Sequence, residues 1–255
     1  MNFRSFHICF LFLVGTLHSV VVGKVYDKQQ SPGLFEGSLS YVISYYSLKS
    51  GKVLDREKIV LAINEERLLF PSLIGDLELG SLIPPGVDSA LVRNDKKDIV
   101  LFGESYDAYR VKSFDMTMLG MVMKGMAFTD TPTNLPEPKF VGKFELRGKR
   151  TELWQYESKE GFRMDLYLSG DFQMNWGLLT KSWLFGAGGL NIRGLADILK
   201  TGKIPVRVDA FENEKRFVSL NLMGVKERSV PEELLNVPNP KVLHSVTQLL
   251  LEAVR

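Results

Sequence analysis

The sequence predicts a mainly β protein of the α+β class, in which a meandering antiparallel sheet carries a few helices. Short segments of alternating apolar and polar residues recur along the chain, and polar turn residues separate them. Strands and helices do not alternate regularly, as they would in βαβ units. The composition, 45% apolar and 24% charged, is that of an ordinary globular protein. We therefore expect an antiparallel sheet in a single domain.

The first strand shows the alternation most clearly. In residues 35–46, FEGSLSYVISYY, the residues Phe35, Leu39, Tyr41 and Ile43 fall on one face of a half-buried strand. The same reasoning predicts strands at 35–46, 58–64, 67–70, 89–94, 98–102, 106–112, 140–146, 150–158, 162–169, 206–212 and 216–227.

Two polar connections separate these strands into sets. Residues 94–97 form a tight turn, and the charged run 95–98 is interpreted as a solvated hairpin tip. The Pro-rich stretch 131–138 is interpreted as a loop within one domain, because strand patterns of the same kind lie on both sides of it.

Three segments have helical patterns. They are residues 113–127, residues 190–200 and a C-terminal amphipathic helix that begins at Asn239 as N-cap, with Pro240 at its first helical position. His244 lies on this last helix, among apolar residues spaced three or four apart.

The first 23 residues have the layout of a secretory signal peptide. Arg4 precedes an apolar run at 8–17, and the cut is predicted after Gly23, with Ser19 as the alternative. The apolar part is short for an uncleaved anchor, which needs about 20 residues. We therefore predict a signal peptide at 1–23 and a single exported, periplasmic domain at 24–255, with no membrane span after cleavage.

Removal of the signal peptide leaves no cysteine and a single histidine, His244. Disulfides and the common zinc sites are then excluded, and Cys–His or Ser–His–Asp catalysis would need a histidine that lies on a helix. Glycines 186–189 lack the Lys-Ser/Thr that a phosphate loop requires. We expect no cofactor, no metal and no enzymatic activity.

The near-neutral charge of the chain restricts the kinds of partner that it can be expected to bind. Basic and acidic residues number 32 and 30, for a net charge of +2, whereas a nucleic-acid binder needs a strong basic surplus. A nucleic-acid partner is therefore not expected, and shape and apolar surface remain as the means of recognition.

The order of five segments resembles that of exported bacterial proteins of unknown function related to the outer-membrane lipoprotein carrier LolA. The chain departs from this pattern at Leu235, where an aromatic residue is common, and in its C-terminal helix. The segments are FEGSLSYVISYY (35–46), SALVRNDKKDIVLF (89–102), VGKFELRGKRTELWQYESKEGFRMDLYLSGDF (141–172), GKIPVRVDAF (202–211) and SVPEELLNVPNP (229–240).

The resemblance implies a strongly curved antiparallel sheet, an open half-barrel with inserted helices over its concave face. The mouth of an incompletely closed barrel is a common ligand site. The residues that we expect to bind an apolar ligand there fall in a methionine-rich segment, which could repack around acyl chains, and in an aromatic cluster before a glycine hinge. They are Met116, Met118, Met121, Met123, Met126, Trp176, Trp183 and Phe185.

Each set also has a structural interpretation. The methionines would fill the gap between a lid helix and the sheet, and the aromatic cluster would form a buried helix. Trp154 and Tyr156, which lie on a strand, are interpreted as core residues.

Two functions follow from this reasoning. The first is an envelope protein that binds or carries a lipid, a lipoprotein acyl chain or another apolar molecule. The alternative is a structural or protein-interaction module whose groove is filled by its own side chains.

Overall fold

The computed structural model describes residues 34–71, 87–104, 107–112, 137–158, 161–178, 195–238 and 242–245. Twelve strands form one sheet in the order β12-β6-β5-β4-β3-β2-β1-β11-β10-β9-β8-β7. The strands are β1 (Gly37–Tyr46), β2 (Val53–Ile63), β3 (Arg67–Phe70), β4 (Val87–Arg93), β5 (Asp98–Gly103), β6 (Asp107–Lys112), β7 (Lys139–Leu146), β8 (Lys149–Glu157), β9 (Phe162–Ser169), β10 (Ile204–Glu212), β11 (Lys215–Glu227) and β12 (Val242–Ser245).

Two antiparallel meanders make up most of this sheet. Strands β1 to β6 pair in sequence order, and strands β7 to β11 do the same. The meanders join where β1 pairs with β11, for example with Tyr45 opposite Val218. The strands on both sides of the Pro-rich connector therefore share one sheet, and every strand predicted from the alternation is present.

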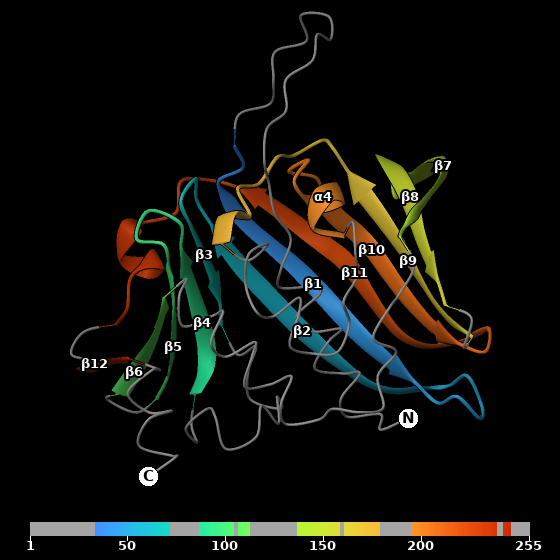
Figure 1. Ribbon diagram of the computed structural model, residues 1–255, viewed down its shortest axis with the longest axis horizontal. Coiled ribbons are helices and arrows are strands. Elements are labelled where there is room, and N and C mark those ends of the chain that lie inside the picture. The colour runs from blue at the N-terminus through green and yellow to red at the C-terminus, as the bar shows by residue number, and fades with distance from the viewer. Residues whose placement is uncertain are drawn as a thin grey trace, which may run out of the picture.

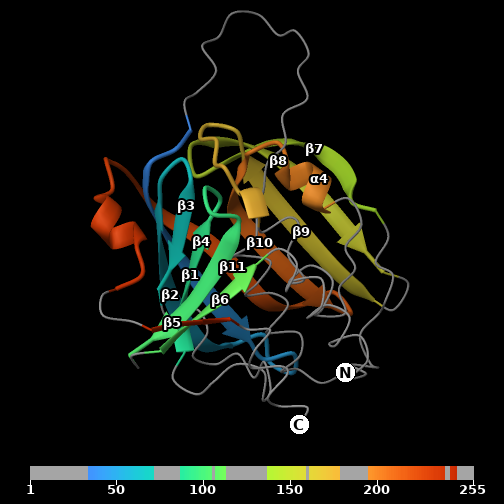
Figure 2. The ribbon, with the colours of Figure 1, turned by 60° about the vertical axis from the view of Figure 1, so that its left-hand side comes forward.

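The sheet is curved and open. Figure 1 shows it bending from β12 and β6 at one edge to β7 and β8 at the other, and Figure 2 shows the interior of the curve. The edge strands β12 and β7 do not pair with each other, so the sheet is not a closed barrel. This architecture confirms the mainly β class and the open curved sheet expected from the sequence.

One face of the sheet carries the main hydrophobic core, and we call it the concave face. It contains Leu39, Tyr41 and Ile43 of β1, as their alternation predicted, and it continues from β6 to β8. Burial of this face is the dominant source of stability in a chain whose described part holds few helices.

On the outer, convex face an apolar cluster lies over β3 to β6. Leu91, Val100, Phe102 and Ala108 form a second cluster there, and Val237 packs against it. Val237 follows a short 3-10 helix, η3 (Glu232–Leu235). Strands β4 and β5 are therefore buried on both faces, which explains the uninterrupted apolar runs 90–92 and 99–102 in their sequences.

Within the described part of the chain, the helix predictions are only partly confirmed. Helix α4 (Leu195–Leu199) lies within the predicted segment 190–200, and Ile198 and Leu199 join the main core. The predicted helix 113–127 lies outside the described residues.

The beginning of the predicted C-terminal helix is wrong. Val242–Ser245 forms β12, a parallel edge strand beside β6, instead of a helical turn. His244 Nε2 lies 2.8 Å from Asp107 Oδ1, and its ring stacks on Tyr109 at 5.8 Å. These contacts with β6 outweigh the local helical signal, and residues 246–255 lie outside the described residues.

Candidate apolar binding face

The concave face is built from lateral rows in which one residue of each strand stands directly opposite the next. Directly opposed residues of antiparallel strands share a face, so the register defines each row. The row that we call the tyrosine row contains Tyr156, Met164, Ala210, Val218 and Tyr45. The adjacent row contains Trp154, Leu166, Val208, Leu220 and Ile43.

Neither row contains a charged residue. Each row crosses five strands, and the four spacings between them, at about 4.8 Å each, give the row a length of roughly 19 Å. These rows therefore form a broad apolar surface from β8 to β1. Its side chains are buried by the chain's own atoms except for Trp154, which is partly buried, and Tyr156, Leu166 and Leu220 are fully covered.

One end of the concave face is crossed by residues 173–178, which we call the strap (the gold segment between β9 and β3 in Figure 1). Phe35 donates its backbone N–H to the carbonyl of Gln173 at 2.6 Å, before β1 begins. Met174 N–H donates to the Gly202 carbonyl at 2.9 Å. The strap is thus tied to both meanders at their junction.

The strap continues to the opposite side of the curve. Asn175 Nδ2 donates to the Glu65 carbonyl at 2.9 Å, in the turn between β2 and β3. The Asn94 side chain, in the turn between β4 and β5, accepts from Leu178 N–H at 2.8 Å and donates to the Asn175 carbonyl at 3.2 Å. The strap therefore fixes the curvature of the sheet at this end, while the tyrosine row lies toward the other end.

Trp176 is the one predicted ligand-binding residue that the structure describes. Its side chain is fully buried within the strap, and its Nε1 donates to the Lys203 carbonyl at 3.2 Å. Ligand contact by Trp176 stays a prediction. Trp183, Phe185 and the five methionines at 116–126 lie outside the described residues.

Two tyrosines differ in how their buried hydroxyls are satisfied. The Tyr41 hydroxyl donates to the Pro205 carbonyl at 3.1 Å. The Tyr156 hydroxyl is buried and has no hydrogen-bond partner among the described residues. Burial raises the pKa of both phenols, so both remain protonated donors at ordinary pH. The sequence indicated that Tyr156 is buried, but the missing partner depends on the tertiary structure.

Polar groups on the concave face gather near the strap. Lys203 Nζ binds Glu152 Oε2 at 2.5 Å, and Trp154 Nε1 lies 3.4 Å from the same oxygen. The Glu152 and Lys203 side chains are about one-quarter exposed, at 23% and 24%. The concave face is thus polar near the strap and apolar at the tyrosine row.

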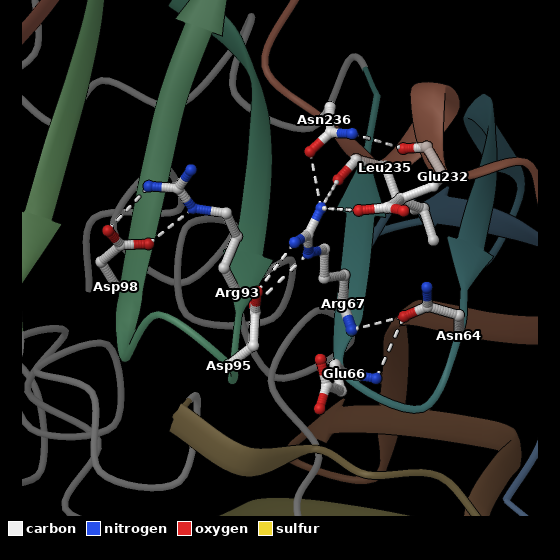
Figure 3. Close-up of polar contacts among 9 residues, drawn as sticks. All are labelled: Asn64, Glu66, Arg67, Arg93, Asp95, Asp98, Glu232, Leu235 and Asn236. Atoms are coloured by element: carbon white, nitrogen blue, oxygen red, sulfur yellow. Dashed lines mark hydrogen bonds and ion pairs between the residues drawn. The ribbon is translucent and has the colours of Figure 1, made fainter.

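On the convex face, Arg67 joins η3 to the hairpin of β4 and β5 (Figure 3). Its guanidinium donates to Asp95 Oδ2 at 2.8 Å, to the Leu235 carbonyl at 3.2 Å and to Asn236 Oδ1 at 2.6 Å. This Arg67 side chain is only 10% exposed. The hydrogen bond to Asp95 holds the pKa of the Asp95 carboxyl below its usual value.

Arg93 lies directly opposite Arg67, and such a pair of like charges is unfavourable unless each is neutralised. Arg93 binds Asp98 with two hydrogen bonds of 2.7 Å, as Figure 3 shows. The prediction that run 95–98 is a solvated tip is therefore wrong for Asp98, whose buried carboxylate is paired with Arg93. It is confirmed for Asp95, Lys96 and Lys97, which are exposed, although the Asp95 carboxylate also binds Arg67.

A second charged group lies on the convex face of β9 and β10. Asp165 and Asp209 are directly opposite each other and largely buried. Arg207 Nε binds Asp209 Oδ2 at 2.6 Å, and Arg163 Nε lies 3.4 Å from Asp165 Oδ1. Burial raises the pKa of Asp165 above its usual value, although Gln155 and Arg163 act in the opposite direction.

Within the described ranges, no three His, Cys, Asp or Glu side chains are placed to hold a metal ion. In the same ranges, no helix has the length and apolar character to cross a bilayer.

No protein-family model matches the chain, and no curated protein matches it in sequence. Solved structures do match it. An uncharacterized conserved protein from Thermus thermophilus is 8% identical with a TM-score of 0.41, covering 82% of this chain and 91% of that chain.

Two further matches are PNGF-II and a LolA superfamily protein from Nitrosomonas europaea. PNGF-II is 10% identical with a TM-score of 0.46 over 85% of this chain, which spans only 33% of the PNGF-II chain. The LolA superfamily protein is 9% identical with a TM-score of 0.32, covering 80% of this chain and 91% of that chain.

Proposed function

We propose that this chain is a non-enzymatic, exported envelope protein that binds a lipid or a lipoprotein acyl chain on its concave face. The observation that carries the proposal is the uncharged surface formed by the tyrosine row and the row beside it on an open, curved sheet. Such a surface attracts an apolar ligand by the same burial that stabilises the core.

Binding would exchange one set of apolar contacts for another. Apart from the partly buried Trp154, the side chains of both rows are buried without a ligand, so a bound chain replaces the protein's own atoms above them. This exchange costs little when the ligand is as apolar as the atoms it displaces. Met164 in the tyrosine row is flexible enough to adjust its packing to a new neighbour.

The direct test is recovery of the exported form after expression of the full chain in a bacterium. Native mass spectrometry and organic extraction of this material should find a bound lipid, and a fluorescent fatty acid should bind and be displaced by that lipid. Material that carries no lipid and does not take up the fluorescent fatty acid would refute the proposal.

A second candidate, a protein-interaction module, is favoured by the edge strand β7. Phe140, Val141 and Phe144 are 49%, 50% and 45% exposed on this strand, whose outer edge pairs with no other described strand. Exposed apolar edges of this kind accept a partner strand. A photo-crosslinking residue at Phe144 should then capture an envelope protein, whereas the same residue at Asn221 on the convex face should not.

A further inference from the structure

We propose that the Tyr156 hydroxyl binds the carbonyl oxygen of an acyl ester whose hydrocarbon chain lies along the tyrosine row. This inference rests on the proposed function and names the chemical class of its ligand. The proposed hydrogen bond would give the ligand one polar contact on a surface that contains no charged residue.

The first argument is the unsatisfied hydroxyl. Buried side-chain donors almost always have a partner, and a buried donor without one costs free energy. Tyr156 has no exposed surface and no partner among the described residues, whereas Tyr41 on the same face donates to Pro205. An acceptor supplied by a ligand would remove this cost.

The second argument is position. Tyr156 lies at the β8 end of the tyrosine row, directly opposite Met164, and the row continues through apolar side chains to β1. A ligand oxygen held at Tyr156 would leave its chain in contact with Met164, Ala210 and Val218. One polar group followed by a long apolar path matches the form of an acyl group.

The third argument concerns charge and distinguishes an ester from a free acid. A carboxylate buried beside Tyr156 would lie among Trp154, Met164 and Leu166, none of which can neutralise it. Burying an unpaired charge is far more costly than burying a hydrogen-bonded neutral carbonyl. The surroundings of Tyr156 therefore favour the ester.

The test uses brominated chains, which quench tryptophan fluorescence on contact, with Trp154 in the adjacent row as the nearby reporter. Methyl dibromostearate, dibromostearate and dibromooctadecane are titrated into the exported form of the full chain. The variants are Tyr156→Phe and, as a matched control on the convex face of the next strand, Tyr167→Phe. We expect Tyr156→Phe to weaken methyl ester binding about three- to tenfold and to leave dibromooctadecane binding unchanged.

Other outcomes overturn the inference in distinguishable ways. Equal ester affinity in wild type and Tyr156→Phe would mean that a water molecule satisfies the hydroxyl. If Tyr156→Phe lost equal affinity for the free acid and the ester, the ligand class would be a fatty acid instead of an ester. Absence of binding by wild type to all three probes would remove the proposed function together with the inference.

Discussion

Tyr41 and Tyr156 lie on the same face of one sheet and are both fully buried, yet only Tyr41 has its hydroxyl bound within the described structure. The Tyr41 hydroxyl meets the Pro205 carbonyl at 3.1 Å, on the strand two places away across the sheet. The Tyr156 hydroxyl meets no acceptor among the described residues. The hydroxyl of Tyr41 thus joins two strands, whereas the hydroxyl of Tyr156 is a donor without an acceptor among the described residues.

This contrast predicts opposite effects of removing the two hydroxyls. Tyr41→Phe should lower the free energy of unfolding of the lipid-free protein by about 1 kcal/mol, because a buried hydrogen bond is lost. Tyr156→Phe should leave it unchanged or raise it, because no bond is lost. Urea unfolding monitored by circular dichroism measures both variants, and equal losses would contradict the assignment.

Arg67 is predicted to be a major contributor to stability. Arg67→Met should lower the free energy of unfolding by about 3 kcal/mol, because Asp95 and the Leu235 carbonyl lose a buried partner. Arg67→Lys should recover only part of this loss, because an ammonium cannot bind the carboxylate with two parallel hydrogen bonds. Lys96→Met, on the exposed part of the same hairpin, is the control and should have little effect. A small loss in Arg67→Met would mean that η3 is held by its apolar contacts.

The lowered pKa of Asp95 predicts a loss of stability in acid. Its contribution is fully present above pH 3.8, the usual pKa of the carboxyl, and is lost as pH falls through the lower pKa of the folded state. Asp95→Asn should therefore be less stable than wild type at pH 7, and the difference should shrink below pH 3.8. A difference that stays constant down to acid pH would contradict the role of ionised Asp95.

Asp165 is predicted to behave in the opposite way. Burial raises its pKa, so the favourable state is the protonated one, and its contribution is lost as pH rises from 3.8 through the pKa of the folded state. Asp165→Asn should therefore raise stability at pH 7 and have no such benefit below pH 3.8. Destabilisation at pH 7 would show that the contacts with Gln155 and Arg163 outweigh burial.

Gly177 in the strap and Gly51 in the turn between β1 and β2 form a matched pair of glycine substitutions. Gly177 has φ of +42°, and a Cβ there would lie 1.8 Å from Asn94 Oδ1. Gly51 has φ of +68°, with open space around it. Both changes to alanine incur backbone strain of about 1 kcal/mol, but Gly177→Ala should lose at least about 1 kcal/mol more because Asn94 must move. Hydrogen exchange at the Leu178 amide should accelerate in Gly177→Ala alone, and equal behaviour of the two variants would exclude the clash.

The strands were predictable because their signal is local. Leu39, Tyr41 and Ile43 alternate with small or polar residues, and the core confirms that they share a face. The β12 segment was not predictable in the same way. Asn239 and Pro240 are good helix-start residues, and the contact of Val242 with Asp107 that makes a strand comes from a distant part of the chain.

The candidate site was less predictable than the fold. The turn at 94–97 places Arg93 opposite Asp98, so this ion pair could have been predicted from the hairpin register. Arg67 and Asp95 are 28 residues apart and meet only through tertiary structure. The unsatisfied donor on Tyr156 likewise depends on neighbours from other strands, which the alternation of β8 cannot reveal.

The pairing of β1 with β11 has a consequence for how the chain folds. Each meander can form from neighbouring segments, but the central pair joins residues near opposite ends of the sequence, such as Tyr45 and Val218. Contacts of such long sequence separation slow folding, and until they form, β1 and β11 each leave a strand edge able to mispair with another molecule. We expect the pairing of β1 with β11, at the centre of the sheet, to be the last step of folding.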